Sequence, residues 1–425
     1  MENLPLTGNR KPRFFYGYIV VAAGLLVMVI TTGALYSFGV FFKPVLIEFG
    51  WTRAATSGAY SLCILVLGSL SIIMGRLNDR FGPRIVVTVC SFLLGSGYLL
   101  MSQISAIWQL YLFYGILAGT GLSGVYVPTI STVARWFVKR RGLMTGIAMS
   151  GIGLGTMIMP PIANWLISSY GWRTSYFVIG ITVMALTILT AQFLRRDPSQ
   201  MGQLPYGEGK AEQESLNLAI TGFTLQRATR TSQFWMICAM FLCYGVFIQS
   251  IIVHIVPHAT DLEISAASAA SILAIIGGVS VAGRIIMGSV GDRIGNKLTS
   301  IVCFITVLAA LLWLLAAKEL WMLFLFAIVF GFGYGGLASL VSPMVAELFG
   351  LSSHGVILGA IFFGMAFGET TGPIITGHIF DTTGNYLPAF LVCIILSIIA
   401  ILLASFLRPL TNEGTNKQTI SNQHG

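Results

Sequence analysis

The fold is decided by the stretch Ala282-Gly283-Arg284-Ile285-Ile286-Met287-Gly288-Ser289-Val290-Gly291-Asp292-Arg293-Ile294-Gly295. Its first part places Arg284 inside an apolar segment, and its second part ends that segment in a glycine-rich charged turn. A charged side chain inside a long apolar segment is costly unless it finds a partner or reaches water. The stretch therefore indicates a membrane-spanning segment whose arginine either serves a substrate or reaches for the membrane surface.

The composition extends this interpretation to the whole chain, which has 425 residues, 56% of them hydrophobic and only 9% charged. Such a low charge fraction excludes an ordinary soluble domain. Apolar runs of about 20 residues or more recur, each long enough to cross ~30 Å of hydrocarbon as a helix. We predict an all-α membrane protein with twelve transmembrane helices, at residues 16–42, 54–75, 84–102, 107–135, 142–168, 174–193, 233–257, 266–288, 298–317, 320–346, 354–377 and 386–407.

The basic residues set the expected orientation. Most fall in turns on the side of the N-terminus, whereas only Lys43, Arg53, Arg173 and Lys318 fall on the other side. Because basic residues concentrate in cytoplasmic loops, both termini are expected in the cytoplasm of a multi-pass protein of the plasma (cell inner) membrane. The net charge of +9 then reflects topology and a lipid bilayer partner, and no nucleic acid is expected.

The chain divides into two predicted halves of six helices, 1–194 and 233–410. A polar cytoplasmic linker, 195–232, separates them and has room for a short surface helix near 211–220. The polar residues 411–425 predict a disordered cytoplasmic tail.

The charged turn is repeated along the chain. Copies stand at 75–84, 288–297 and 377–386, with a worn copy at 164–173, so the turn recurs every three predicted helices. Because successive copies fall on alternate sides of the membrane, we predict inverted three-helix repeats, the architecture of an alternating-access transporter.

Two copies resemble a known family signature. Asp79-Arg80 and Asp292-Arg293 stand in a G-x-x-x-D-R-x-G pattern that resembles the loop signature of the major facilitator superfamily. The aspartates could accept hydrogen bonds from a neighbouring helix N-terminus or pair with a basic residue, which would give all four residues a gating role. The alternative is a solvated charged turn.

A narrower resemblance lies at 135–151, Arg-Trp-Phe-Val-Lys-Arg-Arg-Gly-Leu-Met-Thr-Gly-Ile-Ala-Met-Ser-Gly. It resembles the signature of monocarboxylate transporters and of the related oxalate/formate exchangers. Taken by themselves, the basic residues predict a cytoplasmic anchor, and Gly142, Gly146 and Gly151 predict a small-residue face for close helix packing.

Arg284 has two interpretations. It shares a helical face with Ser280, while Ile272 and Ile286 lie on the opposite, lipid-facing side. Its guanidinium could snorkel to the nearby cytoplasmic interface, or it could bind a carboxylate in a central cavity. The resemblance supports the second, because monocarboxylate transporters have an arginine at this point that is thought to bind the substrate carboxylate.

Two departures from those relatives concern proton coupling. Ser280 stands where animal monocarboxylate transporters have an aspartate, and Tyr36 stands where they have a lysine. We therefore predict other proton-coupling candidates, Asp261, Glu369 and His254, because a buried carboxyl or imidazole can exchange a proton. The expected substrate-binding residues are Arg284, Tyr126, Tyr334, Phe362, Tyr36 and Ser280.

These observations predict a secondary active transporter of a small, lactate- or pyruvate-like monocarboxylate, coupled to a proton and functional as a monomer. One cavity cation suits one carboxylate, and Met365 stands where oxalate exchangers carry a lysine. The alternatives are an oxalate/formate-type anion exchanger and a non-transporting membrane sensor on the same fold. No nucleophile–base pair, metal spacing or nucleotide motif is found, so no enzyme activity, cofactor or metal is expected.

Overall fold

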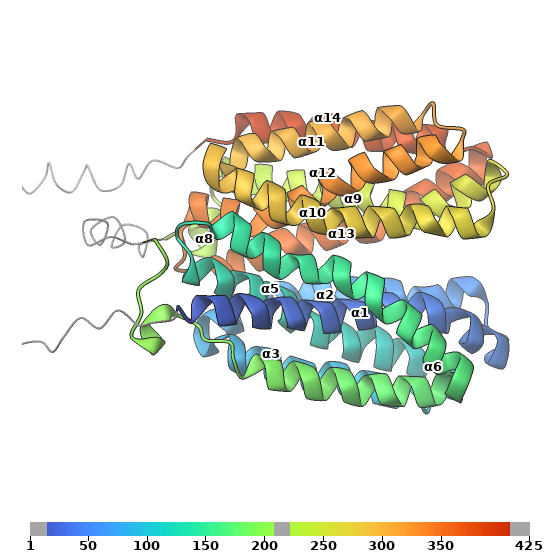
Figure 1. Ribbon diagram of the computed structural model, residues 1–425, viewed down its shortest axis with the longest axis horizontal. Coiled ribbons are helices and arrows are strands. Elements are labelled where there is room, and N and C mark those ends of the chain that lie inside the picture. Colours follow the sequence, from blue (N-terminus) through green and yellow to red (C-terminus); the bar gives the residue numbers. More distant parts are fainter. Residues whose placement is uncertain (1–14, 208–221, 409–425) are drawn as a thin grey trace, which may run out of the picture.

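The computed structural model describes residues 15–207 and 222–408, and nearly all of this is helical (Figure 1). The long helices are α1 (Gly17–Phe49), α2 (Arg53–Phe81), α3 (Pro83–Met101), α5 (Gly119–Trp136), α6 (Arg141–Ala191), α9 (Ser232–Asp261), α10 (Ala266–Ile294), α11 (Asn296–Leu314), α12 (Leu320–Phe349), α13 (His354–Thr383) and α14 (Leu387–Phe406). The short elements are α4 (Ile107–Leu110), the π-helix η1 (Tyr111–Ala118), the 3₁₀ helix η2 (Pro198–Met201) and α8 (Leu225–Ala228). The predicted all-α architecture is confirmed.

The number of spans agrees with the prediction once α6 is divided. Within the described residues, eleven helices are long and apolar enough to cross a membrane, and α4, η1 and α5 together form one of them. Helix α6 has 51 residues, about 76 Å at the usual rise, more than twice the thickness of the hydrocarbon. Gly171 interrupts it with φ 77° and ψ 161°, so α6 covers the two spans predicted at 142–168 and 174–193.

The repeated charged segments are helical over most of their length, which corrects the prediction of a turn. Helix α2 continues through Asp79 to Phe81, and α10 continues through Asp292 to Ile294. The chain turns only at Gly82 (φ 82°) and Gly295 (φ 93°), in a conformation that favours glycine. The prediction ends these two helices before the charged residues of the repeated segments, which is too early. A helix can extend past its apolar run wherever its polar side chains find partners.

Helices α1 to α6 occupy the lower part of Figure 1 and α9 to α14 the upper part. Two core clusters are built from the first group of helices and one mainly from the second. The described chain begins and ends at the same end of the bundle, where residues 192–207 and 222–231 also lie; we call this the linker end. The domain boundaries stay a prediction, and the expected helix near 211–220 and the tail 411–425 lie outside the described residues.

Two glycine-lined seams join the two groups of helices. Helix α2 meets α13 so closely that a Cβ on Gly359 would press on the carbonyl of Ser71. Helix α6 meets α10 in the same way, since a Cβ on Gly146 would press on the carbonyl of Arg284. The small-residue face predicted on α6 is therefore confirmed at Gly146. The seams correspond position by position, so Arg284 stands in the second seam where Ser71 stands in the first.

Candidate functional site

A central cavity lies between the two groups of helices. Its empty volume is about 740 Å³. Eight helical elements contribute to its wall, which is mainly apolar and aromatic; the lining residues are Leu35, Tyr36, Ile64, Leu67, Tyr126, Met149, Ile152, Tyr244, Ile248, Gln249, Ile252, Arg284, Tyr334, Ala338, Phe362, Met365, Ala366 and Glu369. An apolar cavity with a few convergent polar groups is the usual form of a small-molecule site.

Arg284 is held inside this cavity and is only 1% exposed. Its Nη1 donates a hydrogen bond to Ser280 Oγ at 2.5 Å, and its Nη2 donates to Tyr334 Oη at 2.9 Å. The guanidinium carbon also lies 5.0 Å from the centre of the Tyr334 ring, within cation–π range. Ser280 precedes Arg284 by one helical turn of α10 and lies farther from the linker end. The side chain of Arg284 therefore points toward the middle of the bundle. The snorkelling interpretation is wrong.

The guanidinium of Arg284 lacks an acidic partner. In the part of the chain that the structure describes, no carboxylate lies within ion-pair distance of it. Its Nε is buried and has no hydrogen-bond acceptor. A buried, uncompensated charge costs several kcal/mol, on the order of 3–5 when a pair is broken. The site is therefore electrostatically suited to an anion.

The aromatic residues predicted for the site lie in the cavity wall. Tyr36, Tyr126, Tyr334 and Phe362 all line it. Ser280 is fully buried and holds Arg284 without lining the cavity itself.

Sequence reasoning missed two polar residues of the wall, Tyr244 and Gln249. Tyr244 precedes Gly245, where a Cβ would press on the carbonyl of Met365. Tyr126 follows Gly121 and Gly124, so an aromatic residue near a glycine is a signal that the sequence contains for both tyrosines. Gln249 is an amide within an apolar helix, where a polar side chain is costly and therefore a signal of a site.

The cavity continues away from the linker end. A second cavity of about 1110 Å³ shares Tyr36, Gln249 and Glu369 with the first. It reaches Phe42 near the end of α1 and Ile374 in the later part of α13. The path from Arg284 therefore leads toward the opposite end of the bundle.

The linker end is held together by the two repeated aspartates. Asp79 accepts hydrogen bonds from the backbone N–H groups of Gly355 (3.3 Å) and Val356 (3.1 Å), at the start of α13. Asp292 accepts from Gly142 (2.7 Å) and Leu143 (2.8 Å), at the start of α6. Each carboxylate thus satisfies free N–H groups at a helix N-terminus, where negative charge is favoured.

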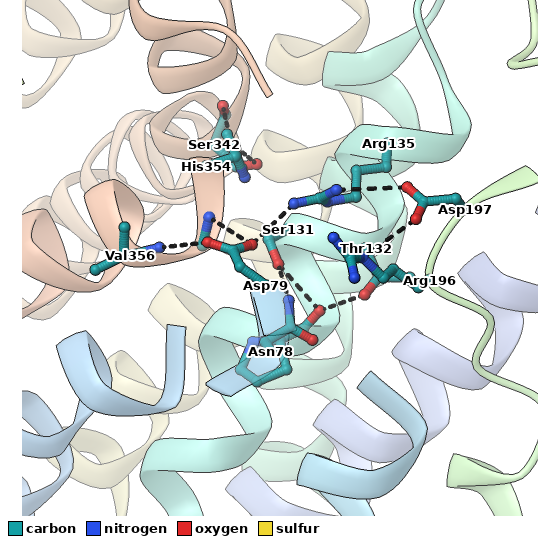
Figure 2. Close-up of polar contacts among 12 residues, drawn as sticks. Asn78, Asp79, Ser131, Thr132, Arg135, Arg196, Asp197, Ser342, His354 and Val356 are labelled. Atoms are coloured by element: carbon teal, nitrogen blue, oxygen red, sulfur yellow. Dashed lines mark hydrogen bonds and ion pairs between the residues drawn. The ribbon is translucent and has the colours of Figure 1, made fainter. Parts of the chain in front are cut away.

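The arginine that pairs with Asp79 is Arg135, and not Arg80, which follows Asp79 in the motif. Arg135 Nη2 lies 2.8 Å from Asp79 Oδ1, and Arg135 Nη1 lies 3.4 Å from Asp197 (Figure 2). Arg80 and Arg293 are exposed and form no ion pair within the described residues. The structure brings the two aspartates to the seams and leaves the two arginines at the surface. Arg135 is the first residue of the motif at 135–151, whose basic residues are predicted to form a cytoplasmic anchor.

Two of the predicted proton-coupling residues lie outside both cavities. Asp261 ends α9 and is exposed. His254 Nε2 lies 3.2 Å from the carbonyl of Pro373, and its ring lies beside Tyr386. Glu369 differs from both, because it lines the two cavities where they meet, with no hydrogen bond or ion pair recorded within the described residues.

Comparisons with known proteins agree with this architecture. The sequence profile of the Major Facilitator Superfamily matches residues 24–290 and 235–423. Monocarboxylate transporter 12 of Mus musculus is 28% identical, over 92% of this chain and 85% of its own length. Monocarboxylate transporter 13 of Bos taurus is 28% identical, over 89% of this chain and 86% of its own length.

Solved structures give the same fold at low identity. The E. coli fucose:proton symporter superimposes with a TM-score of 0.67 at 15% identity, covering 91% of this chain and 98% of that one. A proton:xylose symporter gives a TM-score of 0.71 at 13% identity, covering 92% and 96%. With the profile match over most of its length, the chain belongs to the Major Facilitator Superfamily and is a secondary transporter similar to the monocarboxylate transporters.

Proposed function

We propose that this chain carries a small monocarboxylate, of the size of lactate or pyruvate, together with a proton. Arg284 binds the carboxylate in the central cavity. The observation that carries the proposal is a buried guanidinium in a cavity wall with no acidic partner in the described structure. The likeness to monocarboxylate transporters, which covers about nine-tenths of the chain, supports the same substrate class.

The charge of the site favours a monoanion. Ser280 and Tyr334 orient the guanidinium and leave its Nε free to donate. One carboxylate neutralises this single cation and can accept two parallel hydrogen bonds from it. A dicarboxylate would bring a second negative charge into an apolar wall that includes Met365 and Phe362, and that charge would lose its hydration without a partner.

Glu369 is the proposed proton carrier. With Arg284 positive and the substrate negative, the loaded site is neutral only when Glu369 is protonated. An ionised Glu369 would add a charge that burial disfavours. Binding of the anion and of the proton therefore support each other, which is the requirement for symport.

Alternating access supplies the movement. In the described conformation the cavity leads to the end opposite the linker. Breaking the aspartate contacts at the two seams would let the linker end open while the other end closes around Arg284. The proposal puts the linker end, with both termini, on the cytoplasmic side of the cell membrane, because basic residues concentrate in cytoplasmic loops.

The test is uptake of labelled lactate, pyruvate, formate and oxalate by proteoliposomes, with and without an inward proton gradient. The proposal expects uptake of lactate or pyruvate that rises with the gradient, and no uptake of oxalate. Gradient-independent counterflow of oxalate or formate would instead make the chain an anion exchanger. No uptake of any of the four, by protein whose fold is verified, would contradict the proposal.

A further inference from the structure

A second basic site lies at the linker end, apart from the central cavity. A cleft of about 670 Å³ separates the start of α3 from the segment that follows α6. Its wall includes Arg84 and Ile85 on one side and Leu194, Arg195 and Arg196 on the other. Three arginines therefore contribute to the wall of one small opening.

The positive charge of this cleft is only partly compensated. Asp197 lies 3.2 Å from Arg196, but Arg84 and Arg195 form no ion pair within the described residues. Their recorded partners are neutral: Arg84 Nε donates to the Gln192 side chain at 2.7 Å, and Arg195 Nη1 donates to the Gln192 carbonyl at 2.6 Å. These bonds orient the two arginines and leave their charge available to an anion.

The backbone of α3 adds to the positive potential. The helix begins at Pro83, immediately after the turn at Gly82. Because the first N–H groups of a helix have no partner within it, those of Arg84 and Ile85 face the helix entrance as free donors. An N-terminal turn together with arginines is the arrangement that binds phosphate oxygens.

The cleft opens beside a surface that is apolar and exposed. On α3, Ile85, Val89 and Phe92 follow one another along the helix and are 55%, 54% and 56% exposed. Near the end of α6 and just after it, Leu189 and Phe193 are 62% and 53% exposed. In a membrane-spanning bundle such a surface faces acyl chains, and a cleft at its end lies at the depth of the headgroups. We propose that this cleft binds the phosphate headgroup of an anionic phospholipid, whose acyl chains lie along α3 and α6.

The other half of the molecule provides an internal comparison. By the correspondence of the repeats, Lys297, Leu407 and Arg408 stand where Arg84, Leu194 and Arg195 stand, and they line a cleft of about 350 Å³. There the lysine Nζ donates to the Leu407 carbonyl at 2.7 Å, and Glu347 brings a negative charge into the wall. This cleft is smaller, and its wall holds two cations and one carboxylate, whereas among the described residues the wall of the first cleft holds three arginines and no carboxylate. The proposal therefore assigns lipid selectivity to the first cleft alone.

The test measures lipid retention by the purified full chain. Native mass spectrometry counts the molecules of phosphatidylglycerol or phosphatidylcholine bound over a range of lipid concentrations. The wild type is expected to retain phosphatidylglycerol selectively. The triple variant Arg84→Gln, Arg195→Gln, Arg196→Gln should need a phosphatidylglycerol concentration at least about tenfold higher to reach the same occupancy.

Two further variants keep the test decisive. Arg84→Gln alone changes one exposed side chain, so it should fold normally and weaken retention by about fivefold. The matched control Lys297→Gln, Arg408→Gln should retain the lipid like the wild type. Equal retention by the wild type and both arginine variants would overturn the proposal, as would an equal loss in the control. Displacement of the lipid by soluble glycerol phosphate at the same concentration would assign the cleft to a soluble anion instead.

Discussion

Arg284 shows how a single residue acquires a role from its surroundings. The sequence placed it in a membrane span and on the same face as Ser280, and the hydrogen bond between them confirms that face. The sequence could not show that Tyr334, fifty positions away, would hold the second nitrogen. That contact depends on how α10 packs against α12, a tertiary arrangement that periodicity does not encode.

The first prediction concerns that contact. Tyr334→Phe keeps the ring over the guanidinium and removes the hydroxyl that accepts its hydrogen bond. A hydrogen bond from a charged donor contributes about 1.5–3 kcal/mol, so KM for the carboxylate should rise about tenfold or more, with a smaller change in kcat. Initial uptake rates over a concentration series give both constants. Tyr176→Phe is the matched control, because its buried hydroxyl has no hydrogen-bond partner among the described residues and its removal should leave KM unchanged. An unaltered KM in Tyr334→Phe would mean that the contact does not position Arg284.

Glu369 carries the second prediction. Glu369→Gln keeps the size and polarity of the side chain but removes the exchangeable proton. Gradient-driven accumulation should be lost, while counterflow of preloaded substrate persists, because the substitution leaves the proposed carboxylate site at Arg284 intact. The same two assays on Asp261→Asn provide the comparison, since Asp261 lies outside both cavities. Loss of coupling in Asp261→Asn, with coupling kept in Glu369→Gln, would transfer the proton role to Asp261.

Among the elements, the seams show what a sequence repeat can and cannot predict. The repeated Asp79 and Asp292 segments were recognisable from the sequence, as was the glycine face of α6. The helices that these segments contact were not predictable. No local sequence pattern indicates that α2 packs against α13 or that α10 packs against α6. The ends of α2 and α10 were also placed too early, since hydropathy stops at the first charges whereas the backbone turns only at Gly82 and Gly295.

The third prediction tests the closeness of the second seam. Gly146→Ala would press a methyl group on the carbonyl of Arg284. Overpacking of this kind costs about 1–3 kcal/mol, so the midpoint of thermal unfolding should fall. Gly278→Ala, on α10, is the control because nothing lies within 4 Å of its added Cβ. Equal unfolding midpoints for the two variants would contradict the prediction, because α6 and α10 could then move apart at Gly146 without loss of stability.

The fourth prediction concerns the aspartate contacts. Asp79→Asn removes the charge that two N–H groups of α13 donate to. A charge at a helix N-terminus contributes about 0.3–2 kcal/mol, so amide hydrogen exchange at Gly355 and Val356 should accelerate roughly twofold to thirtyfold. Asp292→Asn should have the corresponding effect at Gly142 and Leu143. Each variant serves as the other's control. If either variant accelerated exchange at both seams, or at neither, the two aspartates would not act as separate local contacts.

For the whole molecule, the number of apolar runs and the repeated turn were enough to predict the fold. Both are properties of the chain that membrane thickness and helix geometry constrain directly. The conformation was not predictable in the same way. Which end of the cavity is open depends on small differences in contact energy between two packings of the same helices. The seam contacts at the linker end, and the second cavity that leads away from it, describe one of these packings.

The central claim is that the buried charge of Arg284 binds the carboxylate of the substrate. The most direct test is the uptake rate of the transported monocarboxylate in proteoliposomes that contain equal amounts of folded wild-type or Arg284→Gln protein. Loss of a charge-assisted hydrogen bond costs about 1.5–3 kcal/mol, so the variant should transport at least about tenfold more slowly at low substrate concentration. Equal rates for the two proteins would contradict the account.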